Sequence, residues 1–254
     1  MTINETARPL AVDQGPTGVL LSHGFTGSPA SMVPWAHYLA EQGHSVRVPR
    51  LPGHGTTWQE MNRTRWQDWY AEVDRTLTEL RERCGTVVVA GLSMGGCLAL
   101  RLAEQRPDDV DGLVLVNPAV TSTDRRMLAV PLIRHFVPSI AGIGNDIKKP
   151  GVEESGYDRT PLHALYSMTR LWRDVGDNLS RVTAPLLLFR SAVDHVVDPS
   201  SAAAILAGVS SRIVREVVLE DSFHVATLDN DADRIYRESA AFVLERSGTG
   251  VPDD

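Results

Sequence analysis

The chain has 254 residues, 43% hydrophobic and 22% charged, so it can bury a core without a structural metal or disulfides. Its two cysteines, Cys84 and Cys97, show the spacing of neither a zinc site nor a disulfide framework. Its net charge of −7 argues against nucleic acid as a partner, because phosphates require a basic face. With no signal-like N-terminus and no apolar run long enough to span a bilayer, we expect a cytoplasmic protein without an integral membrane segment.

Short apolar runs alternate with longer helical patterns, which predicts βαβ units and a mostly parallel sheet flanked by helices, an α/β fold. Six runs have the continuous apolar character of buried parallel strands: Gly18–Leu21, Ser45–Val48, Thr86–Ala90, Gly112–Val116, Pro185–Phe189 and Ile213–Leu219. Apolar spacings and start signals predict helices over Arg65–Leu80, over Gly95–Glu104, from an N-cap at Asp198 with Pro199 as first residue, and over about Asp231–Arg246.

The stretch from Thr121 to about Arg181 interrupts this alternation. It is too long for a strand-to-helix connection and contains apolar residues of its own: Leu128, Val130, Leu132, Ile133, Phe136, Val137, Ile140, Ile143 and Ile147. Segments of this kind within α/β domains are usually lids over an active site. We therefore expect a core formed by residues 1–120 and 182–254, with a cap insertion over residues 121–181.

The run GLSMG at residues 91–95 follows a predicted strand and precedes a predicted helix. This is the G-x-S-x-G pattern in the context of a nucleophile elbow, where a strained turn exposes the serine hydroxyl. The glycines avoid collisions with neighbouring backbone, and the helix N-terminus favours the negative charge of acyl transfer. The alternative is a glycine-rich turn with an incidental serine; a phosphate loop is excluded because no Gly-Lys-Ser/Thr follows. We predict Ser93 as the nucleophile.

A serine nucleophile requires a base, and the base requires an acid that orients it. Asp194 lies just beyond the fifth predicted strand and His224 follows the last one, so both belong at the same edge of the sheet as Ser93. The order Ser, Asp, His along the chain is that of α/β-hydrolases. Asp221 is the alternative acid. Other histidines fit the base less well, because His195 adjoins the acid and the others considered are expected in helices or the insertion: His37, His44, His135 and His163.

The loop after the first predicted strand, HGFTG at residues 23–27, is the expected source of a second oxyanion donor. With His23 and Gly24 forming the turn, the backbone N–H of Phe25 would lie beside that of Met94 and stabilise an oxyanion. No second histidine or carboxylate lies at metal-ligand spacing from His23. We expect neither a metal nor a cofactor.

These motifs together resemble those of the bacterial carboxylesterase and monoacylglycerol lipase group of α/β-hydrolases. The resemblance covers nearly the whole chain: HGFTGSP at 23–29, RLPGHG at 50–55, GLSMGG at 91–96, DHVVDP at 194–199 and SFHVATLD at 222–229. It implies a small cap, an apolar acyl channel and a polar end that recognises a glycerol headgroup. The motif IGNDIKKPGVEE at 143–154 resembles the segment with the headgroup-binding glutamate, which makes Glu154 the first candidate and Asn145 the second. The alternative for both is a solvated surface position.

The residues and the resemblance together predict a serine carboxylic-ester hydrolase that forms an acyl-enzyme intermediate. Its expected substrates are short- to medium-chain esters and monoacylglycerols. Thioester hydrolysis and carbon–carbon bond cleavage remain alternatives, because the same triad can perform them. A non-catalytic ligand-binding protein on this fold is disfavoured, since such proteins usually have a broken triad and all three members are present here.

Overall fold

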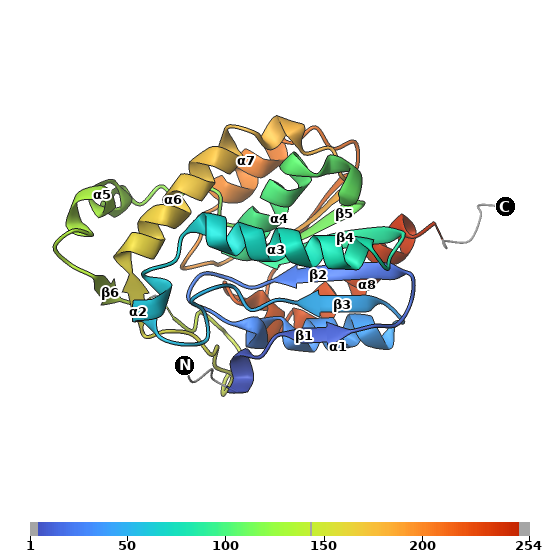
Figure 1. The fold of residues 1–254 in the computed structure, drawn as a ribbon, viewed down its shortest axis with the longest axis horizontal. Helices are drawn as coiled ribbons and strands as arrows, with labels where there is room; N and C mark the ends of the chain where they lie inside the picture. The colour runs from blue at the N-terminus through green and yellow to red at the C-terminus, as the bar shows by residue number, and fades with distance from the viewer. Residues whose placement is uncertain (1–4, 143, 249–254) are drawn as a thin grey trace.

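A seven-stranded, mostly parallel sheet in the order β1-β3-β2-β4-β5-β8-β9 runs through the computed structural model, which describes residues 5–142 and 144–248 (Figure 1). Its strands are β1 (Leu10–Val12), β2 (Thr17–Ser22), β3 (Ser45–Val48), β4 (Thr86–Leu92), β5 (Gly112–Val116), β8 (Leu186–Ser191) and β9 (Val214–Leu219). The six predicted strands and the α/β-hydrolase fold are confirmed. The antiparallel edge strand β1 was not predicted, because its three residues are too few to form a recognisable sequence pattern.

Helices cover both faces of the sheet (Figure 1). One face packs against α1 (Val33–Glu41) and α8 (Ala232–Arg246); the other packs against α3 (Trp66–Arg81), α4 (Met94–Gln105), α6 (Leu162–Gly176) and α7 (Ser200–Gly208). Successive residues of β4 enter the two cores alternately, Val88 on the α1 side and Val89 on the α4 side, because strand side chains alternate in direction. Both faces of the central strands are therefore buried, which explains their unbroken apolar runs.

Two local predictions were wrong, the N-cap residue of α7 and the placement of His44. Helix α7 begins at Ser200, and Pro199 occupies the N-cap position expected of Asp198. The Asp198 carboxylate still accepts a hydrogen bond from the Ser200 backbone N–H at 2.9 Å, because an aspartate can reach the N–H two residues further on. His44 lies in the turn before β3 and not in a helix, since α1 ends at Glu41.

The strands β2, β4, β5, β8 and β9 end at one edge of the sheet. Ser22 is in register with Gly91, Leu92 with Val116, and Ser191 with Leu219. Ligands of open α/β sheets bind outside the carboxyl ends of the strands. The loops that leave this edge are therefore where a ligand-binding or active site is expected.

The inserted segment, residues 121–181, joins β5 to β8 and has two contrasting parts. Its elements before α6 are η4 (Arg125–Ala129), α5 (Val130–Ile133) and a hairpin of β6 (Ser139–Ala141) with β7 (Arg159–Pro161). Helix α6 packs on α4 and buries Leu171 and Val175 completely, whereas Leu128 and Phe136 are 79% and 80% exposed. Figure 1 shows α5 and β6 standing beyond the carboxyl ends of the strands.

The remaining short elements are α2 (Trp58–Met61) and the 3-10 turns η1 (Glu5–Ala7), η2 (Pro29–Ser31), η3 (Pro107–Asp109), η5 (Leu179–Arg181) and η6 (Ala226–Leu228). Within the described ranges, no helix has both the length and the apolarity to cross a bilayer. Ile143, the first residue of the motif at 143–154, lies outside the described residues, as do the first four residues of the N-terminus.

Candidate active site

Ser93 occupies the sharp turn between β4 and α4, with a φ of 55° that is strained for a residue with a side chain. A Cβ on Gly91 would lie 2.3 Å from the carbonyl group of Gly95, and a Cβ on Gly95 would lie 2.1 Å from Ser22 O. Both positions therefore exclude every side chain, as the sequence pattern predicts. The Ser93 N–H donates to Val116 O at 3.0 Å, which fixes the turn to the next strand.

His224 and Asp194 meet beside this turn, on the loops after β9 and β8. His224 Nδ1 lies 2.8 Å from Asp194 Oδ2, and both side chains are less than a tenth exposed. Asp194 Oδ1 accepts two further hydrogen bonds from the N–H groups of Val196 and Val197, each at 2.8 Å. Burial opposes ionisation of Asp194, but these hydrogen bonds, with His224 first, outweigh it and lower the pKa of the carboxyl. Asp194 is thus held as an anion against the imidazole ring.

The structure separates the two candidate acids. Asp221 forms an ion pair with Lys148 at 2.6 Å on the surface, while Asp194 contacts the imidazole. Ser93, Asp194 and His224 all line one cavity of about 560 Å³. Among the described residues no hydrogen bond links Ser93 to His224. Such catalytic hydrogen bonds are often long in free enzymes and shorten in the complex with substrate.

The loop after β2 passes directly over the elbow. A Cβ on Gly24 would lie 3.4 Å from Ser93 Cβ, and Phe25 lines the cavity with its ring packed against Trp69 at a centroid distance of 5.9 Å. Within the described part of the chain, the backbone N–H groups of Phe25 and Met94 donate to no protein acceptor. Both predicted oxyanion donors are therefore available to a ligand at Ser93.

His23, at the start of this loop, has an internal role. Its Nδ1 donates to Gly24 O at 3.0 Å, and its Nε2 accepts a hydrogen bond from Leu51 N at 3.3 Å. Complete burial lowers the pKa of His23 to about 4, so the ring is neutral at physiological pH. The described residues contain no group of three or more His, Cys, Asp or Glu side chains that could hold a metal ion.

Glu154 and Asn145 come from the inserted segment and line the same cavity. Glu154 Oε1 lies against Gly27, where an added Cβ would come within 2.8 Å of it. The carboxylate accepts no hydrogen bond from the described chain, and burial raises its pKa although nearby His224 opposes the shift. Asn145 Oδ1 accepts a hydrogen bond from the Glu154 backbone N–H at 2.8 Å, so Asn145 also holds Glu154 in place. The second headgroup candidate thus supports the first.

Apolar side chains from the inserted segment also line the cavity, and together they are called its apolar wall here. They belong to η4, α5, β6 and α6, and are Met127, Val130, Ile133, Ile140, Leu162, Leu165, Met168 and Trp172. All four elements lie in the cap insertion that the sequence predicts, but the sequence did not indicate which side chains face the site. Ser93, Glu154 and Asn145 line the cavity together with this apolar wall.

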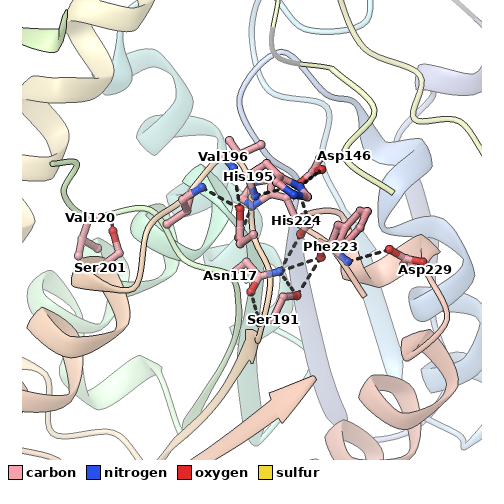
Figure 2. Close-up of polar contacts among 12 residues, drawn as sticks. Asn117, Val120, Asp146, Ser191, His195, Val196, Ser201, Phe223, His224 and Asp229 are labelled. Carbon is pink, nitrogen blue, oxygen red and sulfur yellow. Dashed lines mark hydrogen bonds and ion pairs between the residues drawn. The ribbon is translucent and has the colours of Figure 1, made fainter. Parts of the chain in front are cut away.

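Asn117 was not predicted as a site residue. It fixes the loop after β9 that carries His224, called the histidine loop here, to the sheet (Figure 2). Asn117 follows β5 at a φ of 43°, and its Nδ2 donates to His224 O at 2.8 Å and to Ser191 Oγ at 2.9 Å. Its Oδ1 accepts a hydrogen bond from Ser191 N at 2.7 Å. Asn117 thus connects the ends of β5 and β8 to the loop after β9. A buried Asn directly after a strand was visible in the sequence, but its partners are 74 and 107 positions away.

Comparison with known proteins agrees with this geometry. A family model described as serine aminopeptidase, S33, matches residues 16–231. A thermostable monoacylglycerol lipase of Bacillus sp. (strain H-257) is 42% identical over 244 residues, 95% of this chain and 96% of that protein. A carboxylesterase of Bacillus subtilis (strain 168) is 26% identical over 239 residues, 94% and 96% of the two chains.

A solved structure from a study of LipS and LipT, two metagenome-derived lipolytic enzymes, superposes with a TM-score of 0.94 at 38% identity. The superposition covers 96% of this chain and 100% of that one. The nucleophile elbow, the sheet order and these relatives lead to one conclusion. The chain belongs to the serine aminopeptidase S33 family of α/β-hydrolases, and it is a serine ester hydrolase.

Proposed function

We propose that this hydrolase cleaves monoacylglycerols and other short- to medium-chain esters, with Ser93, His224 and Asp194 as its catalytic triad. One observation carries the substrate assignment: Glu154 is half-buried, its carboxylate accepts no hydrogen bond from the described chain, and it lines the same cavity as Ser93. Other carboxylates of this cavity have partners, as Asp124 does in Arg126 and Asp198 does in Thr123. Glu154 is therefore free to bind a ligand.

In the proposed reaction Ser93 Oγ attacks the ester carbonyl carbon while His224 Nε2 takes the hydroxyl proton. Asp194 keeps the ring oriented through Nδ1. The carbonyl oxygen becomes an oxyanion held by the N–H groups of Phe25 and Met94, each worth about 3 kcal/mol in comparable sites. The bond to the alcohol oxygen then breaks, and His224 returns the proton to the leaving alcohol. Water attacks the acyl-serine by the same route and releases the carboxylic acid.

A monoacylglycerol has the shape that this cavity requires. Its one tail fits along the apolar wall, and its two free hydroxyls can donate to Glu154. Two additional acyl chains would exceed a cavity of about 560 Å³, so we expect triacylglycerols to be poor substrates. In this proposal residues 121–181 act as a cap that shields the ester bond from bulk water.

The family description also raises aminopeptidase activity, since Glu154 could bind the ammonium group of a peptide. That role would require the ammonium group to lose its hydration inside a cavity lined largely by apolar side chains, which is costly for a charged group. A neutral diol makes no such demand. Amino-acid nitroanilides, assayed beside the esters, distinguish the two.

The test of the substrate assignment is Glu154→Ala, assayed on a monoacylglycerol and on a nitrophenyl ester of the same acyl length. A hydrogen bond to a charged group is worth roughly 1.5–3 kcal/mol, so kcat/KM for the monoacylglycerol should fall on the order of tenfold to a hundredfold. The nitrophenyl ester lacks the diol and should be spared. Glu153→Ala is the matched control, because that neighbouring glutamate is exposed and lies outside the cavity.

The result separates three explanations. Equal loss on both esters would mean that the substitution disturbs the inserted segment and would contradict headgroup recognition. No loss on either would leave a general carboxylesterase. Hydrolysis of amino-acid nitroanilides in preference to esters would replace the proposal with a peptidase.

A further inference from the structure

The carboxylate of Asp146, in the inserted segment, bridges the two loops that carry the acid and the base (Figure 2). Asp146 Oδ2 accepts hydrogen bonds from the backbone N–H of His195 and from that of His224, both at 3.1 Å. Its Oδ1 accepts a third hydrogen bond from His195 Nδ1 at 2.8 Å. One side chain thus joins the residue after Asp194 to His224 itself.

We propose that Asp146 is a positioning residue for the catalytic pair, which makes the inserted segment part of the catalytic apparatus as well as a cover. The proposal rests on the triad assigned under Proposed function. The Asp194–His224 hydrogen bond joins the two loops through side chains alone, which leaves their backbones free to shift relative to each other. Asp146 adds a second connection between them, made to their backbones.

The peptide groups around His224 are held from opposite sides. Asn117, at the end of β5, donates to the His224 carbonyl oxygen, while Asp146 accepts from the His224 N–H. The backbone of the segment adds a parallel contact, because the Val225 N–H donates to Asp146 O at 3.1 Å. Contacts on both sides fix the backbone of His224, and the hydrogen bond from Nδ1 to Asp194 then orients the ring on that fixed backbone.

A separate tether means that Asp146 can be tested without releasing the segment. The Asp229 carboxylate is buried and accepts hydrogen bonds from the N–H groups of Lys148 and Lys149, at 2.7 and 2.9 Å, and from Phe223 N at 2.9 Å. Residues 148–149 therefore stay on the histidine loop when the Asp146 side chain is changed. The effect of a substitution should be confined to catalytic geometry.

The decisive comparison is Asp146→Leu against Asp146→Asn. Leucine has the shape of aspartate but accepts no hydrogen bond, whereas the asparagine carbonyl can accept both backbone N–H groups in place of Oδ2. Because a misplacement of about 1 Å can reduce a rate about a hundredfold, Asp146→Leu should lower kcat on a nitrophenyl ester about tenfold to a hundredfold, with KM nearly unchanged. Asp146→Asn should stay within about threefold of the wild type.

Rates are divided by the concentration of sites that a fluorophosphonate labels, so that misfolded protein does not count. If Asp146→Leu does not fold, Asp146→Ala takes its place in the same comparison. The matched control is Asp158→Leu, which changes an exposed carboxylate of the inserted segment that lies outside the cavity. His195→Ala keeps both backbone N–H bonds to Asp146 and removes the ring's contacts with Asp146 and Phe223, so it should cost less than Asp146→Leu.

A kcat for Asp146→Leu equal to that of the wild type would overturn the proposal, and so would an Asn variant as impaired as the Leu variant. A loss that appears in KM alone would also overturn it, because a displaced base slows the chemical step. His224→Ala, measured alongside, tests the triad itself. Full activity in that variant would refute the triad, whereas its inactivity beside a normal Asp146→Leu would refute the positioning role alone.

Discussion

The elbow after β4 and the exposed stretch from η4 to β6 both line the cavity, yet they are held in opposite ways. Around the elbow Met94, Cys97 and Leu98 are completely buried, and the glycines leave no room for a Cβ. In the exposed stretch Leu128, Leu132 and Phe136 are 79%, 69% and 80% exposed. The elbow draws its geometry from the core of the domain, whereas the stretch contributes a wall with little packing behind it.

This difference separates two requirements of the site. A nucleophile and its oxyanion donors must be placed within fractions of an ångström, which demands a closely packed support. A wall that encloses an acyl chain needs only apolar surface and approximate shape. Substitutions in the two regions should therefore differ in which property they change and by how much.

The largest expected effect is at the elbow. Ser93→Ala should leave the fold intact and remove about 10⁴–10⁶ of the rate, because only binding and the oxyanion hole remain. Ser122→Ala is the matched control, since Ser122 also lines the cavity but belongs to the inserted segment. Turnover of a nitrophenyl ester measures both, and a fluorophosphonate should label wild-type Ser93. Near-normal activity in purified Ser93→Ala would refute the nucleophile.

The next largest effect concerns the acid. Asp194→Asn should preserve the structure and lower kcat by up to about 10⁴, because the amide no longer selects the required tautomer of His224. Asp221→Asn should be mild, since Asp221 pairs with Lys148 at the surface. Steady-state kinetics of the two variants measure the difference. The reverse ranking would show that the acid was wrongly assigned.

Substitutions near the elbow should also cost more stability than substitutions in the exposed stretch. Leu98→Ala, in α4 behind the elbow, should lower the free energy of unfolding by about 2–5 kcal/mol, because it leaves a cavity in a packed core. Leu132→Ala, in the exposed stretch, should change it by less than about 0.5 kcal/mol. Denaturant unfolding gives both values. A comparable loss in Leu132→Ala would mean that the stretch is packed in solution.

The last predicted effect is a pH dependence of stability that arises from the buried ring of His23 beside the site. An unfolded chain protonates His23 below about pH 6.5, whereas the folded protein does so only near pH 4, because the ring is buried. The unfolding free energy should therefore fall as the pH drops through this window, by about 3 kcal/mol in total from His23. Urea unfolding at about pH 7.5 and about pH 4.5 measures the loss.

His23→Gln removes one titrating ring and should make that dependence shallower, while His54, whose pKa is also lowered by burial, keeps part of it. His37→Gln, at an exposed position of α1, is the control and should keep the wild-type slope. A variant at position 23 with the full wild-type pH dependence would show that His23 is not the group responsible.

By itself the sequence determined six strands of the sheet, the helices α3, α4, α7 and α8, and the elbow, because each depends on residues that are adjacent or a few positions apart. Continuous apolar runs identified the strands that are buried on both faces, and Gly91 and Gly95 identified a turn that excludes side chains. The order of motifs also predicted the family. The catalytic roles of Ser93, Asp194 and His224, the oxyanion donors and the roles of Glu154 and Asn145 remain predictions that the experiments above can test.

Only the tertiary structure decided which polar groups meet at the edge of the sheet. The choice of Asp194 over Asp221 as the partner of His224 depends on loops that join 30 positions apart in the chain. Asn117 and Asp146 contact His224 from 107 and 78 positions away. Hydrogen bonds at such separations carry no local periodicity, since they follow from which strands end side by side and where the inserted segment folds back onto them.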